Sequence, residues 1–171
     1  MRSVRVAPAP APDEREIVVN VADFAVARER GTIVTSGLGS CVAIVIYDRS
    51  ARVAGLAHVL LPDVEYGRGP LNPAKFPSTA VPLLVGEMRR AGALGPFQAK
   101  IAGGARMFGS LLSTGVNMGE RNTEATRRAL ATAGIAIVRD DVGGEHGRSV
   151  YVDVASGDVR VHSLQRGDLV L

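Results

Sequence analysis

The 171-residue sequence has one cysteine, no tryptophan and only 4% aromatic residues. One cysteine cannot form a disulfide within the chain, and the scarcity of aromatics means that a core must be built from Val, Ile, Leu and Ala. No apolar run approaches the roughly 18 residues of a membrane-spanning helix, and residues 1–15 lack the apolar stretch of a secretory signal. We therefore expect a cytoplasmic protein without membrane insertion.

Charge gives little support for a nucleic-acid partner. The net charge is only +3, and the 20 basic residues are scattered among 17 acidic ones rather than gathered in a stripe. Residues 1–15, with repeated Ala-Pro pairs, are typical of a flexible tail. The length of residues 16–171 suits one globular domain that needs neither metal nor disulfide.

Periodicity predicts strands at both ends of this domain and two helices between them. One helix begins near Thr79 and stops at Gly92, and the second covers residues 120–133. The predicted strands are residues 17–19, 32–34, 42–47, 53–61, 99–102, 135–138, 150–154 and 159–162. Residues 62–79 form a long proline-rich connection. This order predicts an α/β (α+β) layered sandwich with a mixed, largely antiparallel sheet.

Cys41 follows a glycine-containing loop, Thr35-Ser36-Gly37-Leu38-Gly39-Ser40. A lone free cysteine is more often a small buried hydrophobic residue than a reactive thiol. Glycines allow such a loop to aim backbone N–H groups at one point, however, and those of Ser40 and Cys41 are candidates for an oxyanion hole, with Gly39 as loop support. The loop lacks the Gly-Lys-Ser/Thr ending of a P-loop and the third glycine of a dinucleotide fingerprint.

The next two strands form a predicted hairpin that brings a histidine to Cys41. With a turn at Arg49-Ser50, or a loop of residues 48–51, Tyr47 would pair with Arg52 and Cys41 would lie directly opposite His58. An imidazole beside a thiol favours the nucleophilic thiolate and can later protonate a leaving amine. A third group normally orients the imidazole, and Thr35 could do so through its hydroxyl or its carbonyl.

Other interpretations of these and neighbouring residues give them structural roles or name a different base. A single histidine in an apolar strand is more often part of a satisfied core, and His146, in a glycine-containing loop, is the rival base. Gly103-Gly104 and Gly143-Gly144 are typical of tight turns at the outer wall of the site. Glu120-Arg121-Asn122 is typical of a helix start.

Together, these segments resemble the CheD family of chemoreceptor glutamine deamidases. The resemblance runs from about Asn20 to Arg160. It is carried by Thr35 to Cys41, Gly55-Leu56-Ala57-His58, Asn72-Pro73-Ala74-Lys75, Lys100 to Ala105, Gly119-Glu120-Arg121-Asn122 and Asp141 to Arg148. The sequence departs from the family pattern at Ser36 and at Phe76-Pro77-Ser78.

The resemblance implies a layered sandwich related to glutamine-deamidating toxins. It also implies that Cys41 is the nucleophile, His58 the base and Thr35 the orienting residue, with no cofactor and no metal. The implied substrates are glutamines in the cytoplasmic domains of chemoreceptors, and a CheC-type phosphatase is an implied partner. Two alternatives stay open: a non-enzymatic adaptor that binds receptor or phosphatase, and another cysteine hydrolase such as a peptidase or transglutaminase-like enzyme.

Overall fold

The computed structural model describes residues 15–107 and 117–171, so the predicted tail lies almost entirely outside the described residues. The strands are β1 (Glu16–Val18), β2 (Phe24–Arg28), β3 (Thr32–Leu38), β4 (Val42–Asp48), β5 (Val53–Val59), β6 (Gln98–Gly103), β7 (Ala136–Val142), β8 (Arg148–Asp153), β9 (Val159–Ser163) and β10 (Gly167–Val170). The helices are α1 (Pro77–Arg90) and α2 (Met118–Thr132), with short 3-10 helices η1 (Val64–Tyr66) and η2 (Pro73–Lys75).

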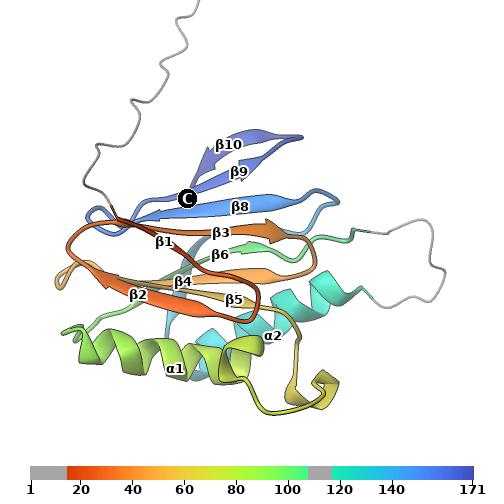
Figure 1. The fold of residues 1–171 in the computed structure, drawn as a ribbon, viewed down its shortest axis with the longest axis horizontal. Coiled ribbons are helices and arrows are strands. Elements are labelled where there is room, and N and C mark those ends of the chain that lie inside the picture. Colours follow the sequence, from red (N-terminus) through yellow and green to blue (C-terminus); the bar gives the residue numbers. More distant parts are fainter. Residues whose placement is uncertain (1–14, 108–116) are drawn as a thin grey trace, which may run out of the picture.

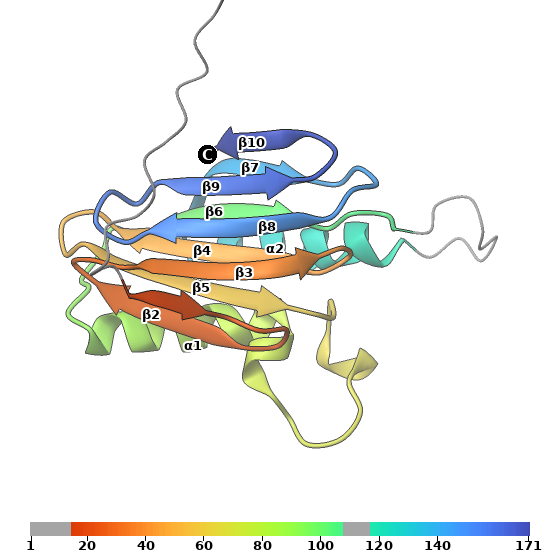
Figure 2. The same cartoon turned by 45° about the horizontal axis from the view of Figure 1, so that its top comes forward.

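The strands form two five-stranded sheets that are stacked on one another. One sheet has the order β1-β3-β8-β9-β10 and the other β2-β5-β4-β6-β7; each is antiparallel except for one parallel pair, β1–β3 and β6–β7. Figures 1 and 2 show α1 and α2 together on the outer face of the second sheet. The predicted layered α/β sandwich is confirmed, with two sheets.

Two cores hold these three layers together. Between the sheets lie residues such as Ala43, Val45 and Val152, while Ile44 and Leu84 belong to the core between the second sheet and the helices. Every residue of β4 and β5 is buried, because both faces of these strands are covered. This explains their nearly continuous apolar sequence.

The predicted hairpin of β4 and β5 forms, but its predicted register is wrong. Tyr47 pairs with Ala54, and Ala43, not Cys41, lies opposite His58. The loop is residues 49–52 rather than 48–51, because Asp48 stays in the strand while its carboxylate accepts the Ala51 N–H at 3.0 Å. The error of two residues leaves every side chain on its predicted face of the sheet.

Both helices and the eight predicted strands are present, although the bounds differ by several residues. The prediction omitted β2 and β10, each of which is one of the two edge strands of its sheet. None of the helices in the described part of the chain is long and apolar enough to cross a membrane.

Candidate active site

The glycine-containing loop lies between β3 and β4, where the chain crosses from the first sheet to the second. Thr35 pairs with Val150 and Leu38 with Arg148, so β3 carries one extra residue at this point. Gly37 has a φ of +72°, a conformation that favours glycine. A β-bulge of this kind re-aims side chains and is common beside active sites. Here it lies just before the last paired residue of β3, Leu38, and so close to Cys41.

The end of β6 fixes the loop from the other side. The Cys41 carbonyl accepts the Gly104 N–H at 2.7 Å, and the Gly39 carbonyl accepts the Ala105 N–H at 2.8 Å. A Cβ atom on Gly103 would lie 2.3 Å from the Cys41 carbonyl oxygen, so only glycine permits this approach. Gly103 and Gly104 both have positive φ, as the predicted turn requires.

Cys41 and His58 lie on the same face of the second sheet, the face that packs against the first sheet. Cys41 belongs to the core between the sheets together with Ala43, which is the direct partner of His58. Cys41 is therefore a diagonal neighbour of His58, and such neighbours are about 7–8 Å apart at Cα, within reach of long side chains. Cys41 is 7% exposed and His58 is fully buried.

Thr35 is also fully buried and joins His58 across the two sheets. Its Oγ1 lies 2.7 Å from His58 Nδ1 and 2.7 Å from the Val19 carbonyl oxygen. A carbonyl can only accept, so the single hydroxyl proton of Thr35 goes to Val19, and the oxygen then accepts from His58 Nδ1–H. This assignment leaves Nε2 as the basic nitrogen of the ring.

The Nε2 atom of His58 is buried and has no hydrogen-bond partner among the residues that the structure describes. Buried polar atoms without a partner are rare and costly, so each one calls for an explanation, of which a catalytic role is one. The backbone of His58 is held by residues 22 and 23, through the Ala22 N–H to the His58 carbonyl and the His58 N–H to the Asp23 carbonyl. The ring therefore presents an unpaired base on the same face as Cys41.

Burial keeps the Cys41 thiol and the His58 imidazole neutral before substrate binds. It lowers the pKa of His58 to about 4, because the imidazolium would be desolvated. Burial also raises the pKa of the Cys41 thiol, while the Cys41 backbone N–H lies against its own sulfur and works in the opposite direction. The resting site is thus a thiol and a neutral imidazole rather than an ion pair.

The depressed pKa of His58 predicts a loss of stability in mild acid. Unfolded histidine binds a proton near pH 6.5 but the folded ring only near pH 4, so the stability present above pH 6.5 is lost as the pH falls toward 4. At pH 4.5 the loss is about 2–3 kcal/mol. Urea unfolding at pH 7 and 4.5 should show it for the native protein, and a smaller loss for His58→Gln. Equal losses of stability in both proteins would show that His58 is not the group whose protonation destabilises the fold.

His146, the rival base, is 4% exposed and lies between β7 and β8. Its ring packs against Gly144, and its carbonyl accepts from the buried Arg148, whose guanidinium also pairs with Asp141 at 2.8 Å. Burial, and secondarily the charge of Arg148, lower the pKa of His146. These contacts give His146 a structural place in the wall formed by the Gly143-Gly144 turn.

Asn122 is a site residue that the sequence interpretation missed. The predicted helix start is confirmed in part, since α2 begins at Met118 with the Asn117 side chain as its cap and Glu120 in the first turn. Asn122, in contrast, is fully buried and donates to the carbonyls of Ser40 at 2.8 Å and Leu60 at 3.1 Å. A polar residue on the buried face of a helix was the available signal.

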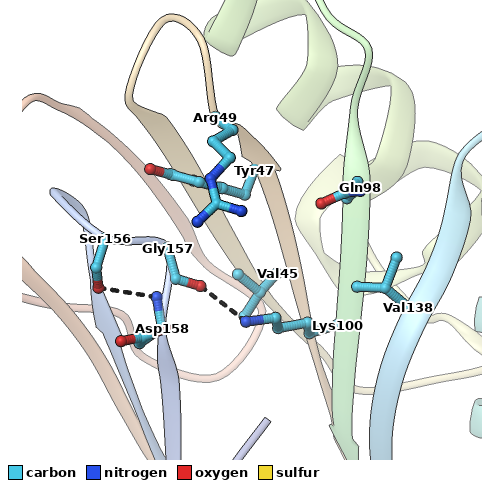
Figure 3. A pocket seen from close by; sticks show the side chains of 9 residues that line it. All are labelled: Val45, Tyr47, Arg49, Gln98, Lys100, Val138, Ser156, Gly157 and Asp158. Atoms are coloured by element: carbon cyan, nitrogen blue, oxygen red, sulfur yellow. Dashed lines mark hydrogen bonds between the residues drawn. The ribbon is translucent and has the colours of Figure 1, made fainter.

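A separate hollow of about 80 Å³ lies at the other end of β4. Figure 3 shows Lys100 donating to the Gly157 carbonyl there, beneath Tyr47 and Arg49. Neither a thiol nor an imidazole lines it, so it lacks the chemistry of the Cys41 site. Residues 15–107 and 117–171 contain no cluster of three or more His, Cys, Asp or Glu side chains that could hold a metal ion.

Comparison with known proteins places this chain in a family. A family model described as "CheD chemotactic sensory transduction" matches residues 60–163. The chain belongs to the CheD family. A relative from Thermococcus kodakarensis is 42% identical over 156 residues, which are 91% of this chain and 97% of the relative. One from Pyrococcus abyssi is 43% identical over 159 residues (91% and 96%), and one from Clostridium botulinum is 41% identical over 149 residues (86% and 92%).

All three relatives are named "Probable chemoreceptor glutamine deamidase CheD". The family-model match begins two residues after His58 and so does not contain the proposed nucleophile or base. The alignment with the Thermococcus relative spans 91% of the chain. A continuous stretch of that length necessarily includes residues 35–58, so the similarity extends over the whole site.

Proposed function

We propose that this protein deamidates glutamine side chains on the cytoplasmic domains of chemoreceptors, with Cys41 as nucleophile, His58 as general base and acid, and Thr35 as the residue that orients the imidazole. The observation that carries the proposal is the hydrogen bond from His58 Nδ1 to Thr35, which leaves a buried Nε2, unpaired among residues 15–107 and 117–171, on the face that Cys41 shares. The names of the CheD relatives support the choice of substrate.

The first half of the reaction consumes the carboxamide. Nε2 of His58 takes the thiol proton as the sulfur of Cys41 attacks the carboxamide carbon of a glutamine, forming a C–S bond and an oxyanion. The backbone N–H groups of Ser40 and Cys41 donate to that oxyanion. The His58 imidazolium then gives its proton to the departing nitrogen, the C–N bond breaks, and ammonia leaves a thioester on Cys41.

The second half hydrolyses the thioester. His58 takes a proton from water as the water oxygen attacks the thioester carbon. The C–S bond then breaks, the His58 imidazolium gives that proton to the departing sulfur to restore the thiol, and glutamate is left on the receptor. Because burial disfavours the imidazolium, with a His58 pKa of about 4, the protonated ring is a strong acid toward the leaving amine. The positive charge of the His58 imidazolium is present only while the reaction is in progress.

The substrate implies where the protein acts, and the family resemblance suggests a second partner. The cytoplasmic domains of receptors require a cytoplasmic protein, and a CheC-type phosphatase is a second partner that the family resemblance suggests. A pull-down with purified phosphatase, performed with native protein and with Cys41→Ala, tests that partner separately from turnover.

The proposal is tested by incubating the purified protein with a chemoreceptor cytoplasmic fragment in ordinary and in heavy-oxygen water. Peptide mass spectrometry should find glutamine converted to glutamate at defined positions, with one heavy oxygen per new carboxylate. The fragment incubated alone is the control. A fragment that keeps all its glutamines under conditions where it binds the protein would overturn the deamidase proposal in favour of an adaptor.

Thr35→Val is expected to lower kcat for deamidation about 100-fold with little change in KM. Valine has nearly the same shape but offers no oxygen to His58 Nδ1–H, so the ring is no longer held in the tautomer that leaves Nε2 basic. Steady-state rates on the receptor fragment measure the effect. Thr35→Ser keeps the hydroxyl and should restore most of the activity; equal losses in both variants would contradict an orienting role.

A further inference from the structure

Three consecutive carbonyl groups around the nucleophile are each held by a donor from another part of the chain. In residues 39–41 these carbonyls accept, in order, from the Ala105 N–H at 2.8 Å, Asn122 Nδ2 at 2.8 Å and the Gly104 N–H at 2.7 Å. Two of the donors are backbone groups at the end of β6. The middle one is a side chain from α2, so it is the one that a substitution can remove.

The hydrogen bond from Asn122 to the Ser40 carbonyl also determines where the Cys41 N–H points. In such a peptide the carbonyl of one residue and the N–H of the next point in opposite directions. The carbonyl of Ser40 points toward α2, so the N–H of Cys41 points away from α2. The helix packs on the outer face of the second sheet, and the Cys41 side chain lies on the inner face. The Cys41 N–H is therefore directed to the side of the sheet where the sulfur and His58 lie.

We propose that Asn122 is a positioning residue for the oxyanion hole: by holding the Ser40 carbonyl, it aims the Cys41 N–H at the oxygen of the reacting carboxamide. This inference rests on the proposed deamidase function and adds a residue to its machinery. The second hydrogen bond of the same amide group, to the Leu60 carbonyl, ties the strand that carries His58 to the same point. One side chain thus fixes the ends of both strands of the hairpin.

The amide of Asn122 has only one orientation that satisfies these contacts. Both neighbours are carbonyl oxygens, so the NH2 group must face them, and each of its two protons has one acceptor. The Oδ1 atom is left buried and unpaired within the described residues. Leaving a buried acceptor unsatisfied is costly, which indicates that the two donated bonds are the reason for an asparagine here.

The first turn of α2 packs closely against the backbone after β6, so the short side chain of Asn122 can reach Ser40. A Cβ atom on Gly119 would lie 2.4 Å from the carbonyl oxygens of both Gly104 and Ala105, so the first turn of α2 touches the backbone that follows β6. Thr123 Oγ1 would lie 2.1 Å from a Cβ on Gly104. The close packing of α2 against residues 104 and 105 fixes the distance from Asn122 to Ser40.

The test separates amide hydrolysis, which forms an oxyanion, from alkylation of Cys41 by iodoacetamide, which does not. For Asn122→Ala we expect kcat for glutamine conversion to fall about 10- to 100-fold. The KM and the second-order rate constant of alkylation should stay within about 3-fold of native. Asn122→Asp, which keeps the side-chain shape but has no NH2 group, should show the same split even if the alanine variant folds poorly.

Thr126→Val is the matched control, because Thr126 lies one turn further on the same buried helix face and its hydroxyl has no partner in the described part of the chain. It should leave both rates near native. Native kcat in the asparagine variants, or a parallel fall of turnover and alkylation, would overturn the positioning role. If the native protein itself converts no glutamine, the proposed function fails, and the inference fails with it.

Discussion

Replacing Cys41 with alanine is expected to reduce glutamine conversion to the background rate, a loss of more than about 10⁴-fold. The reaction passes through a thioester, and Cys41 is the thiol that shares a face of the second sheet with the unpaired Nε2 of His58 within the described residues. The loss should appear in kcat, measured on the receptor fragment by mass spectrometry.

The fold should survive this substitution. Cys41 packs as a small apolar residue in the core between the sheets, and removing its sulfur costs about 1 kcal/mol. Binding of the receptor fragment should therefore persist in Cys41→Ala. Ser40→Ala is the matched control: it changes the neighbouring side chain, keeps the backbone N–H groups, and should leave turnover near native. Substantial conversion by Cys41→Ala would refute covalent catalysis by this residue.

Replacing His58 with glutamine should lower kcat about 10³-fold. Glutamine fills a similar volume but cannot take the thiol proton or return it to the leaving nitrogen. The thiol of Cys41, whose pKa burial has already raised, would then be almost wholly protonated near neutral pH. The loss should shrink as the pH is raised, because hydroxide begins to produce the thiolate without help.

A second histidine variant identifies which imidazole acts. His146→Gln makes the same chemical change at the rival residue, which packs in the wall beside Arg148. Its kcat should stay near native. A large loss in His146→Gln together with a normal His58→Gln would transfer the role of the base to His146 and leave the buried Nε2 of His58 unexplained.

The sequence predicted which residues share a face but not how they pair. Alternation along β4 and β5 places Cys41 and His58 on one side whatever the loop, and the error of two residues preserved that side. The register depended on the loop, where Arg52 adopts a φ of +50° and Asp48 remains in the strand. Such a conformation at an arginine cannot be expected from its residue type.

The contacts that complete the site come from segments distant in sequence. The hydrogen bond between Thr35 and His58 joins the two sheets, and the one from Asn122 to Ser40 joins residues 82 apart. The family resemblance assigned Thr35 but not its geometry. Helical periodicity could have placed Asn122 on the buried face of α2, but not its contact with Ser40. The edge strands β2 and β10 were missed because their sequences, Phe-Ala-Val-Ala-Arg and Gly-Asp-Leu-Val, lack both a β-branched run and a clear apolar alternation.

Trapping the acyl group with hydroxylamine tests the central claim, a thioester between Cys41 and a receptor glutamine, most directly. A thioester on Cys41 would be attacked by hydroxylamine as well as by water, so native protein should convert the same glutamines partly to hydroxamates and partly to glutamates. Cys41→Ala should yield neither product. Conversion to glutamate alone, undiminished by hydroxylamine, would contradict the thioester and show that water attacks the carboxamide itself.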